Sequence, residues 1–153
     1  MTQARGNPKS ILIKEAVTVN IEAVASGVVS PGFLVERTNA AVDTVQAHSS
    51  AAGANAQVLV ALEDELQGNG IDVDYASTDR IPHIRHFRAG DQFLATIDDG
   101  ETITKGDFLE SAGNGKLQKY TSGKAIAVAL ATIDMSDSST ADPSSDRIVV
   151  EVV

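Results

Sequence analysis

Four short apolar runs with turn residues between them mark the segment from Ala89 to Asp134. In the last run, from Ala125 to Leu130, large side chains alternate with alanine. That period of two is typical of a β-strand. We expect Ile126, Val128 and Leu130 to face a core. The alanine face would let a second layer or another subunit approach closely.

Two turn signals lie inside the same segment. Gly106 separates the apolar residues of the run Ile103–Leu109, as a sharp bend between two strands requires. Asn114 and Gly115 tolerate positive φ and indicate a hairpin. Together the runs and turns predict a small, sharply bent β-unit.

The same pattern occurs earlier in the chain, in weaker form. The run Val29–Glu36 matches Ile103–Glu110 if one residue is inserted after the glycine. Further on, Val58–Leu62 repeats the pattern of Ile126–Leu130, and an acidic residue follows each run. The order of the matches predicts a duplicated β-element.

The rest of the chain adds strand patterns and few helix signals. Strands are expected at Ala16–Ala25, Asp43–Ala47, Ile81–Phe87 and Ile148–Val153, with one helical turn at Glu63–Leu66 and polar loops at 49–55 and 137–146. The last strand is apolar on both faces, so it is either central in a sheet or buried against a partner. We therefore expect a mainly β fold: a small bent-ribbon or barrel-like domain of the β-clip or β-tulip type. This single body would span residues 15–153, after an extended N-terminal arm of residues 1–14.

The composition of the chain limits the residues that can form its core and the kinds of chemical site that it can contain. The 153 residues suffice for one domain with a real core, and 42% of them are hydrophobic. Aromatic residues make up 4% and tryptophan is absent, so valine, isoleucine, leucine and alanine must form that core. The lack of cysteine excludes disulfides, thiolate metal sites and cysteine nucleophiles. No apolar run has the length of a membrane span, so we expect a soluble protein without a cleaved export signal.

Charge is unevenly distributed along the chain. Residues 1–14 carry a charge of +3 from Arg5, Lys9 and Lys14, and the net charge of −9 leaves −12 on the remainder. An acidic body repels nucleic acid, so direct binding to DNA or RNA is not expected. A basic arm suits docking onto an acidic protein surface, although a solvated tail would have the same composition.

Residues that could carry chemistry do not form a known constellation. In the basic cluster His83–Arg88, a strand would place the two histidines on opposite faces, which argues against a shared metal. Asp72, Asp74 and Asp79 lack the glycine and distal glutamate of an EF-hand loop. The Ser122–Lys124 triplet lacks the glycine and hydroxyl residue of a phosphate loop. We therefore expect no enzyme activity, catalytic residue, cofactor or metal. The candidate contacts with a protein partner or another subunit are Arg5, Lys9, Ile11, Ile13, Lys14, Arg85, His86 and Arg88.

A family resemblance joins these observations. Five segments, in order along the chain, resemble head decoration proteins of tailed bacteriophages, also called capsid cement proteins: Val60–Asp64, Gly70–Asp72, Ala89–Asp91, Gly106–Leu117 and Ala127–Leu130. The resemblance covers residues 55–153. It implies a β-rich homotrimer on the outer surface of the virion capsid, made in the host cytoplasm, whose arms clamp neighbouring major capsid subunits. The implied partners are the major capsid protein and further copies of the chain, without nucleic acid or membrane.

Two other functions fit parts of the sequence. A β-clip or barrel domain could bind a small ligand or glycan, but such pockets usually expose aromatic side chains and this chain has few. The segment Gly70–Tyr75 loosely resembles a motif of the trimeric dUTPases, in which an aspartate and a tyrosine hold the uridine sugar. The phosphate motif and the glycine-rich C-terminal motif of that family are missing.

Overall fold

Short strands make up most of the structure, a computed structural model that describes residues 9–51, 56–136 and 146–153. One 3-10 helix, η1 (Glu65–Gln67), is the only helix within these ranges. The strands are β1 (Leu12–Lys14), β2 (Asn20–Ala25), β3 (Leu34–Arg37), β4 (Thr44–Ala47), β5 (Leu59–Ala61), β6 (Arg80–His86), β7 (Gln92–Thr96), β8 (Thr102–Ile103), β9 (Phe108–Ser111), β10 (Leu117–Lys119), β11 (Ala127–Ala129), β12 (Ile133–Asp134) and β13 (Arg147–Val152). The mainly β fold predicted from the sequence is confirmed.

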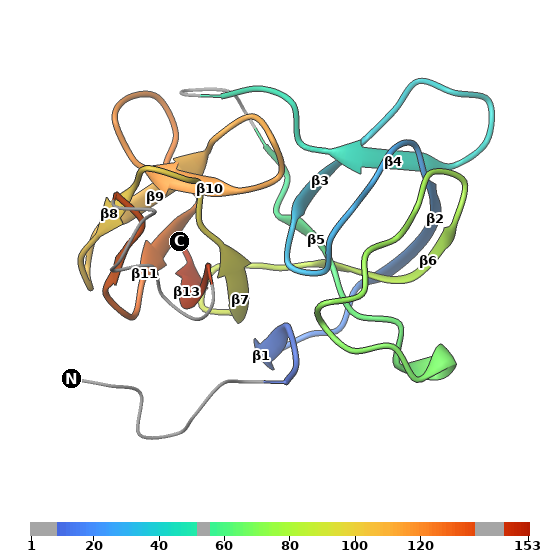
Figure 1. The fold of residues 1–153 in the computed structure, drawn as a ribbon, viewed down its shortest axis with the longest axis horizontal. Coiled ribbons are helices and arrows are strands. Elements are labelled where there is room, and N and C mark those ends of the chain that lie inside the picture. The colour runs from blue at the N-terminus through green and yellow to red at the C-terminus, as the bar shows by residue number, and fades with distance from the viewer. Residues whose placement is uncertain (1–8, 52–55, 137–145) are drawn as a thin grey trace.

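Two units lie side by side (Figure 1). The first is a closed barrel with the strand order β2-β4-β3-β5-β6. The second is a six-stranded sheet with the order β1-β7-β13-β11-β9-β10, accompanied by a ribbon of β8 and β12. A parallel bridge between Ile97 and Leu117 joins the ends of β7 and β10. That bridge curls the second sheet into nearly the same barrel as the first.

The two units repeat one topology, which confirms the predicted duplication and extends it. Going round the first unit, β2-β6-β5-β3-β4 corresponds to β7-β13-β11-β9-β10 in the second. Equivalent hydrogen bonds support the match, because Gly32 N–H donates to the Ala61 carbonyl at 2.8 Å and Gly106 N–H donates to the Ala129 carbonyl at 2.8 Å. The inserted residue expected from the sequence is wrong. Leu34 lies opposite Val60 just as Phe108 lies opposite Val128, so the two runs match without a gap.

Local turn chemistry agrees with the sequence patterns. Gly106 has φ +97° at the bend before β9, and Gly115 has φ +82° in the β9–β10 hairpin. The expected helical turn is η1, which ends at Gly68 with φ +75°. Glycine is favoured at these positions because other residues are strained at positive φ.

The faces of β11 depart from the sequence prediction. Ala127 and Ala129 are fully buried, whereas Val128 and Leu130 are only half-buried. A barrel this narrow is already filled by large side chains such as Leu109 and Val150, so alanine fits its interior. Ile126 is buried as expected, at 3% exposed. Val128→Asp should therefore lower the free energy of unfolding by less than it would if Val128 were buried in the core.

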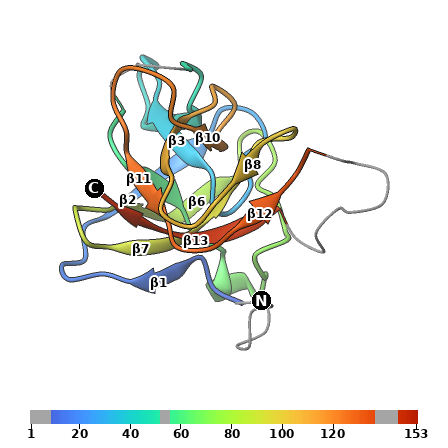
Figure 2. The ribbon, with the colours of Figure 1, turned by 90° about the vertical axis from the view of Figure 1, so that its left-hand side faces the viewer.

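The last strand, β13, is central in its sheet. It pairs with β7 on one side and β11 on the other, and Figure 2 shows it between these neighbours. Val149 and Val150 are both buried within the chain. Of the two options left open by the sequence, the central position is confirmed, so the apolar strand no longer argues for a partner.

The expected N-terminal arm is partly integrated in the body. Residues Leu12–Lys14 form β1, which pairs with β7 at the edge of the sheet. Ile11 is 0% exposed, and its carbonyl accepts a hydrogen bond from Leu94 N–H at 2.8 Å. Its side chain is part of the core of the second unit, so in this structure it offers no exposed surface for the predicted contact. The start of the expected arm, residues 1–8, lies outside the described residues, as does most of the expected loop at 137–146.

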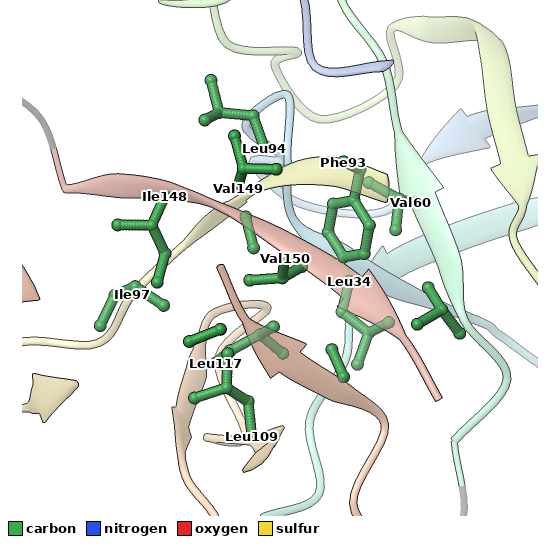
Figure 3. Packing of buried hydrophobic residues seen from close by; sticks show 14 of the residues in the cluster. Leu34, Val60, Phe93, Leu94, Ile97, Leu109, Leu117, Ile148, Val149 and Val150 are labelled. Atoms are coloured by element: carbon green, nitrogen blue, oxygen red, sulfur yellow. The ribbon is translucent and has the colours of Figure 1, made fainter. Parts of the chain in front are cut away.

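A joint between the units completes the fold. Leu34 and Val60 of the first unit are buried in one cluster with Phe93 and Val150 of the second (Figure 3). At this joint, a Cβ atom on Gly115 would lie 2.6 Å from Phe33 Cδ2. The β9–β10 hairpin can therefore approach the first unit only with glycine at this position.

Gly115→Ala should lower the free energy of unfolding far more than Gly100→Ala. Both glycines have positive φ, but a Cβ atom on Gly100 would meet nothing within 4 Å. We expect a loss of about 1–2 kcal/mol from backbone strain at Gly100, and about 2–5 kcal/mol at Gly115 where the clash adds to it. Urea denaturation of the two variants measures this difference. Equal losses would show that the hairpin does not depend on close contact at the joint.

Candidate assembly surfaces

The N-terminal candidates divide by exposure. Lys9 and Lys14 are exposed, and Ile13 on β1 is 40% exposed. Arg5 lies outside the described residues. Lys9, Ile13 and Lys14 are therefore available at the edge of the second unit, beside β1.

The basic cluster on β6 is held largely within the chain. Arg85 Nε donates to Glu15 Oε1 at 3.1 Å, and the two side chains are 16% and 9% exposed. The Arg85 guanidinium also donates to the Asn20 amide oxygen at 2.5 Å. His86 is half-buried, whereas Arg88 is exposed. Arg85 therefore fastens the segment before β2 to β6. Of Arg85, His86 and Arg88, Arg88 is the most accessible.

The three aspartates that were considered as a calcium site do not share a ligand position, because each is bonded to a different partner. Asp72 pairs with Arg147 at 2.7 Å, Asp74 accepts from the Ser30 hydroxyl at 2.6 Å, and Asp79 accepts from Ala76 N–H at 2.9 Å. In the described part of the chain, no group of three or more histidine, aspartate or glutamate side chains could hold a metal ion. Tyr75 is 5% exposed and its hydroxyl donates to the Leu62 carbonyl at 2.7 Å. That tyrosine is packed in the first barrel, away from any position where it could hold a sugar.

A Glu–His–Ser chain crosses the joint between the units. His48 Nδ1 lies 2.7 Å from the Ser111 hydroxyl, and His48 Nε2 lies 3.8 Å from Glu36 Oε1. The order of groups resembles a hydrolase triad. However, His48 and Ser111 are 4% and 5% exposed, and the Ser111 hydroxyl also accepts from Gly113 N–H. A nucleophile must reach its substrate, so this arrangement is better suited to fastening the two units.

Each unit contains one buried or half-buried glutamate held by an equivalent set of donors. Glu36 on β3 accepts from the Gln46 amide and the Ser49 hydroxyl, both at 2.9 Å. Glu110 on β9 accepts from the Gln118 amide at 2.8 Å and the Thr121 hydroxyl at 3.0 Å. The two clusters occupy the same place in the duplicated topology, because Glu36 lies opposite Gln46 and Glu110 opposite Gln118.

The hydrogen bonds keep both carboxyl groups ionised. Burial acts to raise the pKa of Glu110, but the bonds from Gln118, Thr121 and Ser122 outweigh it and lower the pKa below 4.5. At Glu36 burial again acts to raise the pKa, and donors from Ser49 and Gln46, with nearby His48, lower it overall. These clusters were not predicted from the sequence. The signal was the spacing Gln-x-x-Ser/Thr, in Gln46–Ser49 and Gln118–Thr121, after a glutamate on the preceding strand.

Exposed apolar side chains form a row across the outer face of the second unit. Phe108 on β9 is 52% exposed, and it lies opposite the half-buried Val128 on β11. On its other side, Tyr120 N–H donates to the Phe108 carbonyl at 2.9 Å, and Tyr120 is 38% exposed. Residues opposite each other on antiparallel strands share a face, so Tyr120, Phe108 and Val128 form one apolar row. None of these three residues is among the candidate contacts predicted from the sequence.

The fold is similar to that of a protein from a phage head. The match is to the crystal structure of the N base of head fiber gp8.5 in bacteriophage phi29, with a TM-score of 0.59. It covers 90% of this chain and 95% of the head-fiber chain, with 11% sequence identity. At that identity the likeness is one of fold. No protein-family model matches the sequence, and no curated protein does.

None of the helical segments described in residues 9–51, 56–136 and 146–153 is long and apolar enough to cross a bilayer.

Glu110→Gln should destabilise the protein at neutral pH and flatten its response to acid. The folded-state pKa of Glu110 is below 4.5, so its ionised form stabilises the fold above that pH and the stability is lost as the pH falls through the folded value. Removing the charge should cost about 1.5–3 kcal/mol near pH 7. Chemical denaturation from pH 7 to pH 2 measures both effects.

Glu65→Gln is the matched control, since Glu65 is an exposed glutamate in η1. It should leave both the stability at pH 7 and the acid response close to wild type. If Glu110→Gln behaves like this control, the cluster around Glu110 does not stabilise the fold.

Proposed function

We propose that the chain is a structural protein of a tailed-phage head, which binds the outer surface of the capsid and cements neighbouring major capsid subunits. The observation that carries the proposal is the likeness in fold to the N base of the phi29 head fiber, over nearly the full length of both chains. The resemblance of residues 55–153 to capsid decoration proteins is a separate, sequence-based reason for the same proposal.

The charge distribution supports a location outside the shell. The chain has a net charge of −9, so its body repels packaged DNA and would not compete for contacts with the genome. Lys9, Lys14 and Arg88 are exposed cations that could meet acidic groups of a capsid protein. Screening limits such exposed contacts, so they would steer docking more than they hold it.

The tandem architecture suits a mechanical role. Two barrel units share a buried apolar cluster at their joint, and hydrogen bonds from Gly115 and His48 cross it. A body of this kind can transmit load between two attachment points with little change of shape. Three copies on one capsid site would add avidity, because each bound copy holds the others near their partners.

The proposal is tested by co-expressing the chain with the major capsid protein encoded in the same genome. The chain should sediment with expanded shells, and the decorated shells should resist heat or chaotrope better than bare shells. Bare shells and the isolated chain are the controls. A chain that stays in the supernatant while the shells sediment would overturn the proposal.

Replacing Lys9 and Lys14 together with serine should weaken capsid binding at low salt and reduce its dependence on salt. Each exposed ion pair contributes roughly 0.2–1 kcal/mol, so the loss should be modest. Co-sedimentation over a range of salt concentrations measures it. The matched control replaces Lys105 and Lys124, which are also exposed, with serine. Equal effects of the two pairs would show that the edge beside β1 has no special part in docking.

A further inference from the structure

Equivalent rows of side chains in the two units differ sharply in exposure. In the first unit the row is His48, Leu34 and Val60, which are 4%, 1% and 0% exposed. The backbone geometry matches that of the second unit, since His48 N–H donates to the Leu34 carbonyl at 2.9 Å and Tyr120 N–H donates to the Phe108 carbonyl at 2.9 Å. Yet Phe108 is 52% exposed and Tyr120 is 38% exposed. One row is covered and its counterpart is open.

The second unit covers the row of the first. Leu34 and Val60 are buried in one cluster with Phe93 and Val150 of that unit, and its β9–β10 hairpin bonds to the other end of the row. Leu34 N–H donates to the Gly115 carbonyl at 2.8 Å, and Gly115 N–H donates to the His48 carbonyl at 3.1 Å. The Ser111 hydroxyl, at the end of β9, lies 2.7 Å from His48 Nδ1. Within this fold, therefore, the row is a surface onto which a hairpin of another unit docks.

The hairpin of the first unit is free to make the same kind of contact. It is the β3–β4 hairpin, whose base is closed by Thr38 N–H donating to the Thr44 carbonyl at 3.0 Å. The β9–β10 hairpin is closed in the same way, by Ala112 N–H donating to the Lys116 carbonyl at 2.9 Å. Near the tip of the β3–β4 hairpin, Val42 is 65% exposed. Each chain thus offers one open row and one exposed hairpin of the matching type.

We propose that the row Tyr120–Phe108–Val128 is a contact with a second copy of this chain, whose β3–β4 hairpin covers it through Val42. The contact is inferred from the duplication. Only the number of copies of the chain in the assembly rests on the proposed function. It joins different surfaces of two identical chains, so it is heterologous and must close into a ring to remain finite. The docking hairpin lacks the glycine of its counterpart and has a longer loop, so a valine side chain rather than bare backbone fills the contact.

Single charged substitutions on either side of the contact should have the same effect. Phe108→Asp and Val42→Asp should each weaken self-association about tenfold or more, because each places a charge in an apolar contact. Both side chains are exposed in the single chain, so the fold should survive, and far-UV circular dichroism checks this. Leu66→Asp is the matched control, since Leu66 is 73% exposed in η1 and lies outside the contact. It should leave self-association unchanged.

Mass photometry and sedimentation equilibrium of the wild type and the three variants give the answer. A wild-type oligomer that both contact variants break, and the control does not, supports the proposal. A wild-type monomer, or an oligomer that either contact variant leaves intact, overturns it. A monomer that still decorates capsids would overturn this contact while leaving the proposed function standing, so the two failures are distinguishable.

Cysteine cross-linking tests the direction of the contact, because the natural chain has no cysteine. Val42→Cys and Tyr120→Cys chains, mixed and oxidised, should form a disulfide-linked dimer containing one chain of each kind. Neither variant alone should cross-link to the same extent. Cross-linking of Tyr120→Cys to itself would instead indicate a symmetric contact between two open rows, and would overturn the head-to-tail arrangement.

Discussion

The structure depends on the close approach of one hairpin to the neighbouring unit. Gly115 lies against Phe33 with no room for a Cβ atom. Its N–H donates to the His48 carbonyl, and its own carbonyl accepts from Leu34 N–H. Each unit is a barrel of very short strands, and a small barrel buries a smaller fraction of its surface than the joined pair does. The joint adds to the burial by placing Leu34 and Val60 in the core of the second unit. Stability of either unit is therefore tied to the joint.

Duplication explains why the chain is symmetric inside and asymmetric outside. The strand order, the bend glycines Gly32 and Gly106, and the Glu–Gln clusters occur in both units. Joining two equal units head to tail covers one docking row and leaves the other open, as the exposures of Leu34 and Phe108 show. Each chain therefore carries both halves of the proposed contact, an open row and an exposed hairpin. A structural protein that assembles head to tail requires both. The proposed place on a phage head and the proposed self-association thus draw on separate features of one architecture.

Much of the fold could be predicted from the sequence, because turn glycines and period-two patterns act locally. Gly106, Gly115 and the central apolar strand β13 are examples. Properties that depend on distant neighbours were missed. Ile11 looked like part of an arm but is buried. The alanines of β11 looked like an outer face but fill a narrow barrel, and neither fact can be read from a run of neighbouring residues. The exposure of Phe108 likewise depends on which unit the hairpin covers.

Cryo-electron microscopy of heads assembled with the chain tests the central claim most directly. We predict ordered density for the two-unit body on the outer surface of the shell, bridging neighbouring major capsid subunits. Copies should meet with Val42 of one beside Phe108 of the next. Density inside the shell, or shells with no bound chain at saturating concentration, would contradict the account.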